Sequence, residues 1–494
     1  MNIASLLTAA AVVAGIVIEI PIESTLPQNA SDITDNLGNN SNPNEFTANL
    51  IANLAEETGL DPILRICGAT GDRVSYVATQ EDAMIQFWDN SYNLDQPKNM
   101  TIGPRFWESF NVLETGKYTL QLNSYKNDSN YQYNINAMVN ETLRRISNGR
   151  FHLFEQGNEN DVAVGNSFRP AGWGIGNYVV EWKSRTRGAN SEHDNELRYM
   201  APSFATFNSD FSVYSIFNET LDINEDGWIA EISQHLYVTG AQNKISLQGT
   251  LMNHTQVMRT GINILNLNKF HRSAGRYFII GESNSIYGQG ALSISDVFGS
   301  ALWSIDFALY FASQSVRRIH YHQGTSFRYA SWLPIAVNET KPFVKPPYYG
   351  NVFAARFIGP SGKTQINHHL LGDPLHPDEH NVAYAAYDDG KLARVALLNI
   401  LEFNGTQSGE DERPFTTFSF PAPTGVSIAR VARLWAPQAH ENTTIIFDGY
   451  TYSYEQGKGK PLMVSDDEEL VHAQDGVFSV DVEASGAAII TVLQ

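Results

Sequence analysis

Two glutamates, Glu159 and Glu282, stand in similar surroundings in two distant parts of the sequence. A short apolar run and a glycine precede each of them, in the stretches Phe151–Asp161 and Arg276–Gly290. Each run is typical of a buried strand, and the glycine marks the turn at which the strand ends. Two carboxylic acids in one site are what hydrolysis of a glycosidic bond needs, because one donates a proton while the other acts as nucleophile or base.

The spacing of the two glutamates fits the mouth of an α/β barrel. They lie 123 residues apart, which leaves room for three βα units of about 30–40 residues each. The loops after the strands of such a barrel form the mouth where catalysis takes place. Either glutamate alone would more often be a solvated carboxylate at the start of a loop. Their matching positions favour a shared site, and Asn158 opens the one Asn-Glu pair, of seven, that follows such a strand.

His235 and Tyr237 end the predicted strand Ala230–Tyr237, which precedes the strand of Glu282. Neighbouring strand ends of a barrel face the same mouth, so Tyr237 could donate a hydrogen bond to Glu282 and keep it ionised. Two buried aromatic residues with no part in the chemistry would explain the pattern equally well. The sequence leaves both interpretations open.

Three further polar residues lie near predicted strand ends. Arg65 is in the early strand Asp61–Ile66, and a buried arginine normally has a carboxylate partner, so it could also hold Glu282 ionised. Tyr287 and Tyr329 lie a few residues beyond strand ends, where their hydroxyls could donate to a substrate. All three are candidates for supporting the pair of acids.

The order of the predicted elements favours a barrel followed by a second domain. Short apolar strands alternate with helical stretches, which predicts a (β/α)8 TIM barrel over residues 26–365. From residue 381 onward strand follows strand, the pattern of an antiparallel β-sandwich, so we expect that domain over residues 366–494. The fold class is therefore α/β. The predicted helices include Thr47–Thr58, Gln80–Asp89, Asn253–Lys269 and Ser293–Gln314.

The first residues of the chain are apolar and predict a secretory signal peptide over residues 1–15. Ten Asn-x-Ser/Thr sequons spread along the chain favour a secreted, extracellular glycoprotein. The single cysteine, Cys67, excludes an intrachain disulfide, which a chain with so large a core does not need. No membrane attachment is expected once the signal is removed.

The net charge of −20 disfavours nucleic acid as a partner, because such binding needs a clustered basic surface. The same charge disfavours the interior of a long polyanionic sugar. Two stretches suggest a metal at first sight: the four histidines of His368–His380, and Asp222–Ile229, which copies the first half of a calcium loop. The first lacks a metal-ligand spacing, and the second has Ser233 where the loop needs a glutamate. We therefore expect neither a metal nor another cofactor.

The motifs around three of these residues resemble a known family. They read GNEND at Glu159, GESNSIYGQG at Glu282 and QHLYVTG at Tyr237, and are similar to glycoside hydrolase family 79 of clan A, which includes β-glucuronidases and heparanase. The resemblance implies a (β/α)8 barrel with a β-sandwich built from the C-terminal region and an N-terminal strand, here residues 16–25. It also implies a retaining mechanism with Glu159 as acid/base and Glu282 as nucleophile.

The resemblance further implies how a glucuronic acid would be bound. In the family's glucuronidases, the tyrosine after the nucleophile and nearby loop amides bind the sugar carboxylate. These groups map onto Tyr287 and the backbone about Gln289, with Tyr329 as a further contact. The complete set of predicted substrate-binding and supporting residues is Asn158, Tyr237, His235, Tyr287, Gln289, Tyr329 and Arg65.

These observations predict a secreted exo-β-glucuronidase that removes terminal glucuronic acid, with or without a 4-O-methyl group, from glycans. An endo-acting, heparanase-like enzyme is the alternative. A third possibility arises because no first barrel strand is evident: Ser24–Asn44 is a polar loop, and the next strand ends in RICGAT, with Cys67 where the family has a glycine. A chain without that strand would be a catalytically impaired carbohydrate-binding homologue. The sequence predicts no oligomeric state.

Overall fold

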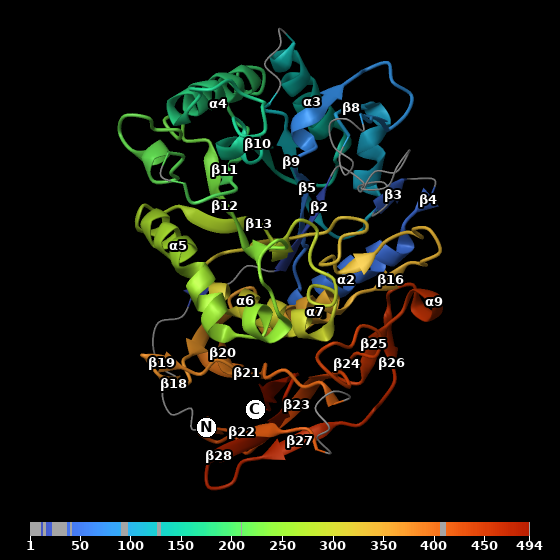
Figure 1. Cartoon of the computed structure of the whole chain (residues 1–494), viewed down its shortest axis with the longest axis vertical. Helices are drawn as coiled ribbons and strands as arrows, with labels where there is room; N and C mark the ends of the chain where they lie inside the picture. Colours follow the sequence, from blue (N-terminus) through green and yellow to red (C-terminus); the bar gives the residue numbers. More distant parts are fainter. Residues whose placement is uncertain are drawn as a thin grey trace.

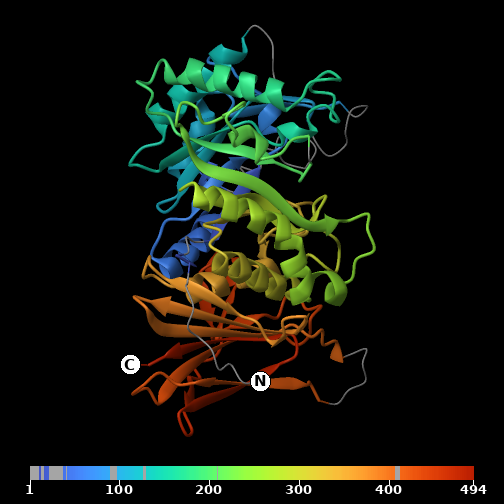
Figure 2. The same cartoon turned by 90° about the vertical axis from the view of Figure 1, so that its left-hand side faces the viewer.

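The computed structural model describes residues 11–12, 16–21, 37–39, 42–89, 97–125, 130–208, 210–405 and 412–493. The molecule has two parts, stacked along its long axis (Figures 1 and 2). One part is a barrel of parallel strands, and the other consists of antiparallel sheets. Helices α6 (Phe298–Ser313) and α7 (Pro346–Ile358) lie between the two parts (Figure 1).

Eight parallel strands close the barrel. Each is hydrogen-bonded to two parallel neighbours, and the last strand, β14, pairs with the first, β2. Short apolar runs such as these are typical of parallel strands that are covered on both faces. The predicted (β/α)8 barrel is confirmed. In order around the barrel, its strands are β2 (Ile16–Pro21), β5 (Ile63–Cys67), β9 (Lys117–Leu122), β10 (Phe151–Gln156), β11 (Tyr199–Phe204), β12 (Ile229–Gly240), β13 (Tyr277–Tyr287) and β14 (Ile319–His322).

The first barrel strand, β2, corrects two expectations. Residues 16–25 were expected to join the sandwich, but Ile16–Pro21 pairs in parallel with β14 and β5, with Ile18 opposite Tyr321 and Glu19 opposite Arg65. The first barrel strand therefore comes before the polar stretch Ser24–Asn44, in which the resemblance to the family had led us to expect it. An isoleucine- and valine-rich run is typical of a barrel strand, but its composition resembles that of the apolar residues before it, which were predicted to be a signal peptide. The expectation of a barrel without its first strand is wrong.

The N-terminal strand of the sandwich is instead β1 (Ala11–Val12), which pairs antiparallel with β17 (Gln365–His369). This short strand falls inside the predicted signal peptide. The other residues of that predicted segment, 1–10 and 13–15, lie outside the described residues.

Helices surround the barrel and fill the junction with the sandwich. Helix α2 (Glu45–Thr58) begins where the side chain of Asn44 accepts a hydrogen bond from the Thr47 backbone N–H at 3.1 Å. It ends at Gly59, which adopts the left-handed conformation with φ of 63°. Helix α6 is buried from Phe298 to Ala312, as expected of an apolar helix packed between two domains. The remaining long helices are α3 (Tyr131–Arg145), α4 (Ile175–Asn190) and α5 (His254–Ser273).

Short elements lie in the connections. One of them corrects the helix predicted over Gln80–Asp89: Met84–Phe87 is strand β7, whose side chains alternate between half-buried and exposed. Such a period of two belongs to a strand, not to a helix. The others are strands β3 (Gly38–Asn39), β4 (Asn42–Pro43), β6 (Val74–Tyr76), β8 (Asn99–Ile102), β15 (Trp332–Leu333), β16 (Phe343–Val344), β18 (Gly372–Asp373) and β19 (His376–Pro377), and short helices η1 (Gly71–Arg73), η2 (Pro104–Asn111), η3 (Asn160–Val162), η4 (Ser215–Phe217) and η5 (Leu247–Leu251).

The C-terminal part is the predicted antiparallel β-sandwich. Strand β28 shows why it forms: its side chains alternate between exposed and buried, so Phe478, Val480 and Val482 face the core. A two-stranded sheet, β22–β28, covers the larger sheet with a shared apolar core between them. The strands are β20 (Asn381–Asp388), β21 (Lys391–Asn399), β22 (Phe415–Pro421), β23 (Ile428–Trp435), β24 (Ile446–Phe447), β25 (Tyr450–Tyr452), β26 (Pro461–Met463), β27 (Glu469–His472), β28 (Val477–Glu483) and β29 (Gly486–Val492), with the short helix α9 (Tyr454–Gly457).

No helix in the described part of the chain combines the length and the apolar character that crossing a membrane requires.

Candidate active site

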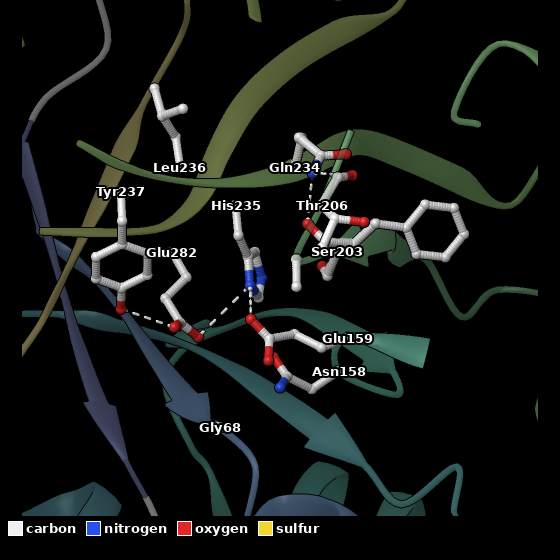
Figure 3. A network of polar contacts seen from close by, with 12 residues as sticks. Gly68, Asn158, Glu159, Ser203, Thr206, Gln234, His235, Leu236, Tyr237 and Glu282 are labelled. Atoms are coloured by element: carbon white, nitrogen blue, oxygen red, sulfur yellow. Dashed lines mark hydrogen bonds and ion pairs between the residues drawn. The ribbon is translucent and has the colours of Figure 1, made fainter. Parts of the chain in front are cut away.

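A cavity of about 680 Å³ opens at the carboxyl ends of the barrel strands. It is the mouth where a TIM barrel carries its chemistry. Glu159 and Glu282 both line it, together with residues from the strands and loops between them (Figure 3). The full lining is Ala69, Asn158, Glu159, Ala205, Thr206, Phe207, His235, Leu236, Tyr237, Thr239, Glu282, Tyr287, Gly288, Gln289, His322, Phe327 and Tyr329.

Two hydrogen bonds hold the backbone of Glu159 in place. Its N–H donates to the Ser203 carbonyl at 2.9 Å, and its carbonyl accepts from the Tyr125 hydroxyl at 2.9 Å. The turn before it needs a glycine, because a Cβ atom on Gly157 would lie 2.1 Å from the Ser124 hydroxyl oxygen. The carboxylate therefore enters the cavity from a fixed turn at the end of β10.

Glu282 lies within β13, where its carboxylate accepts two hydrogen bonds. The Tyr237 hydroxyl donates to Oε1 at 2.8 Å, and Arg65 Nη1 donates to Oε2 at 3.2 Å. Both partners had been predicted as supports of this glutamate. The preceding Gly281 allows β12 and β13 to approach closely, since a Cβ atom there would lie 1.9 Å from the Ser233 hydroxyl oxygen.

Arg65 connects the two glutamates from below the cavity. It is completely buried, and its Nε and Nη2 atoms donate to the two oxygens of Glu155 at 2.9 Å each. Nη2 also donates to Asn158 Oδ1 at 2.7 Å. The guanidinium thus fixes Asn158, next to Glu159, while it contacts Glu282 directly.

The hydrogen bonds of His235 define its protonation. Arg65 Nη2 lies 3.3 Å from Nε2, and a donor-only, positively charged guanidinium at that place disfavours a hydrogen on Nε2. The proton of the neutral ring is therefore on Nδ1, which lies 2.9 Å from Glu159 Oε1 and donates to it. Burial lowers the pKa of His235 to about 4, so the neutral form predominates at neutral pH.

The two glutamates have opposite pKa shifts although they share one cavity. Burial, followed by the charges of Glu282 and Asp161, raises the pKa of Glu159 well above its ordinary value. Burial also opposes the ionisation of Glu282, but His235, His322, Arg65 and the Tyr237 hydrogen bond outweigh it and hold its pKa well below the usual range. Of Arg65, His235 and His322, only Arg65 is charged at neutral pH, because burial lowers the pKa of both histidines to about 4. The surroundings therefore favour the protonated form of Glu159 and the ionised form of Glu282 in the same cavity.

Comparison with known proteins identifies the family of this chain. It is 34% identical over 484 residues to a β-glucuronidase of Aspergillus niger, which covers 93% of this chain and 88% of that protein. It is 31% identical over 503 residues to a β-glucuronidase of Neurospora crassa, covering 90% of this chain and 89% of the relative. Residues 383–489 match the C-terminal β-domain of glycosyl hydrolase family 79. The chain belongs to glycoside hydrolase family 79. It is a glycosidase.

Solved structures place this family 79 glycosidase among enzymes of the same fold. It superimposes on a 4-O-α-L-rhamnosyl-β-D-glucuronidase from Fusarium oxysporum with a TM-score of 0.78 at 20% sequence identity, covering 98% of this chain and 97% of that chain. An α-L-arabinofuranosidase from Thermotoga maritima superimposes with a TM-score of 0.60 at 11% identity, covering 100% and 99% of the two chains. At these identities the likeness establishes the shared barrel and sandwich alone.

The predicted residues Tyr287, Gln289 and Tyr329 line the part of the cavity beside β13 and β14. The Tyr287 hydroxyl accepts from Gln242 Nε2, and its side chain is 46% exposed. Gln289 adopts φ of 68°, and its carbonyl accepts from the Arg328 N–H at 2.8 Å. The three predicted residues thus lie together at one end of the cavity.

Sequence reasoning missed two titratable residues of this site. Glu155, the fork partner of Arg65, was hidden inside the apolar run of β10, where a lone acid is itself a sign of a buried partner. His322 ends β14, and its Nδ1 lies 3.0 Å from the hydroxyls of both Tyr237 and Tyr329. Its place as the last residue of a predicted strand was the signal that could have identified it.

One set of described side chains has the spacing of a metal site, and it coincides with this cavity. One ligand atom from each of Glu159, His235 and Glu282 lies within 4.8 Å of the others. The Arg65 guanidinium contacts both His235 and Glu282, and a permanent cation at that place disfavours a divalent ion. Within the described residues, neither the loop His368–His380 nor the turn Asp222–Ile229 contributes to such a set.

Proposed function

We propose that this family 79 glycosidase is a secreted exo-β-glucuronidase that acts with retention of configuration. The observation that carries the proposal is the pair of carboxyls with opposite pKa shifts at one barrel mouth, the buried Glu282 and the partly exposed Glu159. Two enzymes of 34% and 31% identity are named β-glucuronidases, which supports the choice of sugar.

The first step forms a covalent intermediate. The ionised Glu282 carboxylate attacks the anomeric carbon while Glu159 gives its proton to the glycosidic oxygen, and the bond to the aglycone breaks. His235 donates to Glu159 Oε1, which leaves the proton of Glu159 on Oε2 as the donor. In the second step Glu159 takes a proton from water, the water oxygen attacks the anomeric carbon, and the bond to Glu282 breaks.

The separation of the carboxyls supports retention over inversion. An oxygen of Glu159 lies within 4.8 Å of an oxygen of Glu282. Inverting enzymes hold their carboxyls about 6.5–9.5 Å apart so that a water fits beneath the sugar, whereas retaining enzymes hold them at about 5–5.5 Å. Direct attack by Glu282 therefore suits this spacing better than attack by water.

Neutral donors are proposed to bind the carboxylate of the sugar. The described lining of the cavity contains no lysine or arginine, but Tyr287 and Tyr329 present hydroxyls at the end beside β13 and β14. Gly288 and Gln289, with φ of 81° and 68°, are proposed to turn their N–H groups toward the sugar carboxylate, whereas the Gly290 N–H donates to the Ile286 carbonyl at 3.1 Å. The Asn158 amide, whose oxygen accepts from Arg65, leaves its nitrogen to donate to a hydroxyl of the ring.

Exo action is favoured over the endo-acting alternative. The net charge of −20 repels the interior of a polyanionic chain more strongly than it repels one terminal glucuronate. The proposal of an impaired homologue loses its basis, because β2 completes the barrel.

Secretion is proposed from the sequons. Six of their asparagines are exposed, so their amides could carry a glycan: Asn39, Asn99, Asn140, Asn218, Asn338 and Asn442. Asn253 is 9% exposed, and its side chain caps α5 by accepting from the Gln256 N–H at 3.2 Å, so we expect no glycan there. Mass spectrometry of glycopeptides from the culture medium tests both statements.

A panel of chromogenic substrates tests the proposed function. Purified protein is incubated with the 4-nitrophenyl β-glucuronide, β-glucoside and β-galactoside. We expect release from the glucuronide alone, with the product initially in the β configuration by NMR. Release from a neutral sugar would overturn the specificity, and an α product would overturn retention.

A further inference from the structure

A single aromatic ring stands at the opposite end of the cavity from the proposed carboxylate-binding groups. Phe207 lines the cavity and is 41% exposed. It follows β11, which is the barrel neighbour of β10 and hence of Glu159. Tyr287 ends β13, Gln289 follows it and Tyr329 follows β14, all on the far side of Glu282. The hydroxyl-bearing residues of the cavity therefore lie on the β13–β14 side of the nucleophile, and Phe207 lies on the side of the acid.

The backbone that carries Phe207 is held from both sides. Asp161, two residues after Glu159, accepts from the Ala205 N–H at 2.9 Å and from the Thr206 N–H and hydroxyl at 2.8 and 2.7 Å. From the barrel side, Gln234 Nε2 donates to the carbonyls of Phe204 at 2.6 Å and Thr206 at 3.1 Å (Figure 3). The loop before Phe207 is thus fixed relative to the turn that carries the acid.

Phe207 is not needed to fill the core. Its side chain borders the main cavity on one side and a separate cavity of about 120 Å³ on the other. A large exposed aromatic ring on an immobilised loop at the edge of a cavity is a typical contact for a flat apolar ligand face. The main cavity, at about 680 Å³, is in the range of pockets that enclose drug-sized ligands, which leaves room beyond one sugar ring.

We infer that Phe207 is the platform on which the leaving group of the substrate stacks. The inference rests on the proposed function, in which Glu159 protonates the glycosidic oxygen, so the aglycone lies on the side of Glu159. Its substrates would be β-glucuronides whose aglycone presents a flat apolar face, either the C–H face of a pyranose or an aromatic ring. Phe207 is a specificity-determining residue with no part in proton transfer.

Three substrates measured with wild type and with Phe207→Ala test the inference: β-glucuronosyl galactose, phenyl β-glucuronide and methyl β-glucuronide. Covering about 50 Å² of ring at about 25 cal/mol/Å² corresponds to about tenfold in binding. We expect kcat/KM to fall about tenfold on the substrates with a ring aglycone, mainly through KM, and much less on the methyl glycoside, which has no face to stack. A loss confined to one ring substrate would identify whether sugar or aromatic aglycones are the ligands.

Two variants serve as controls. Phe207→Trp keeps an aromatic face, so we expect it to retain most of the activity on the ring substrates. Phe87→Ala removes a ring of similar exposure from strand β7, no residue of which lines the cavity. Equal losses on all three substrates, with an unchanged melting temperature, would overturn the inference. So would no loss on any of them. If wild type cleaves no glucuronide, the proposed function itself fails and the inference falls with it.

Discussion

Arg65 and Glu155 are joined by two parallel hydrogen bonds of 2.9 Å, with both side chains completely buried. The pair spans the barrel from β5 to β10, across the intervening strand β9. The same guanidinium reaches Asn158 at 2.7 Å and Glu282 at 3.2 Å. Because a planar fork fixes its partners in direction as well as distance, Glu155 orients Arg65, and Arg65 orients the groups on either side of the cavity.

Removal of the Glu155 carboxylate, which accepts two hydrogen bonds from Arg65, should therefore destabilise the fold. Glu155→Ala leaves a buried guanidinium without its main counter-charge, and we expect the free energy of unfolding to fall by about 3–5 kcal/mol. Chemical denaturation followed by fluorescence measures the change. Lys98→Ala breaks an exposed ion pair with Asp89 and should leave the unfolding midpoint almost unchanged. If the unfolding midpoint of Glu155→Ala changed as little as that of Lys98→Ala, the Arg65–Glu155 pair would not stabilise the fold.

If Glu159 is the acid, as proposed, the effect of replacing it depends on the leaving group of the substrate. Glu159→Gln cannot donate a proton, so kcat/KM on methyl β-glucuronide should fall about 10²–10⁴-fold. A dinitrophenyl glucuronide, whose leaving group departs without a proton, should lose far less. Steady-state kinetics on the two substrates checks this, with Glu219→Gln as a control on an exposed loop. Equal losses on both substrates would exclude Glu159 as the acid.

The Tyr237 hydroxyl predicts a change in the pH profile. The plot of kcat/KM against pH should be bell-shaped. Its acid limb rises as Glu282 ionises, and it falls as Glu159 loses its proton at higher pH. Tyr237→Phe removes a 2.8 Å hydrogen bond that favours the ionised form of Glu282, so the pKa of Glu282 rises and the acid limb moves to higher pH. Loss of a hydrogen bond to a charged group should also reduce kcat/KM about 10–100-fold.

Tyr287→Phe is the matched control for that experiment. The Tyr287 hydroxyl accepts from Gln242 and lies at the end of the cavity that is proposed to bind the sugar carboxylate. Its loss should raise KM while the acid limb stays in place. An acid limb that moved equally in both variants would show that Tyr237 does not act through Glu282.

The pair of acids could be predicted from the sequence because the strands that carry them were assigned correctly. In a barrel, the carboxyl ends of all strands face the same mouth. Glu159 and Glu282 are far apart in the chain, yet one contact each with His235 and Tyr237 joins them to the same strand, β12. Arg65 was predicted from the cost of burying an unpaired charge. These inferences needed only local pattern and a general rule of the fold.

Other features could not be predicted in this way. The composition of β2 is the same as that of an apolar leader, so only its pairing with β5 and β14 distinguishes the two. The contacts of Glu155 depend on which face of β10 turns inward, and a one-residue change of register reverses that face. Phe207 lies on a loop without periodicity, and the hydrogen bonds of Asp161 and Gln234 that hold the preceding Thr206 are tertiary contacts that local pattern does not predict.

Buried neutral histidines predict that the fold weakens in acid. His271 on α5 is buried, neither ring nitrogen has a hydrogen-bond partner in the described structure, and burial lowers its pKa to about 3. The unfolded chain binds a proton there below pH ~6.5 while the folded protein does not, so stability is full above that pH and declines as pH falls toward about 3. His271→Phe should reduce this slope by about 1.4 kcal/mol per pH unit. Denaturation curves from pH 4 to 7 measure it, with the exposed His376→Asn as a control. An unchanged slope would mean that His271 charges in the folded state.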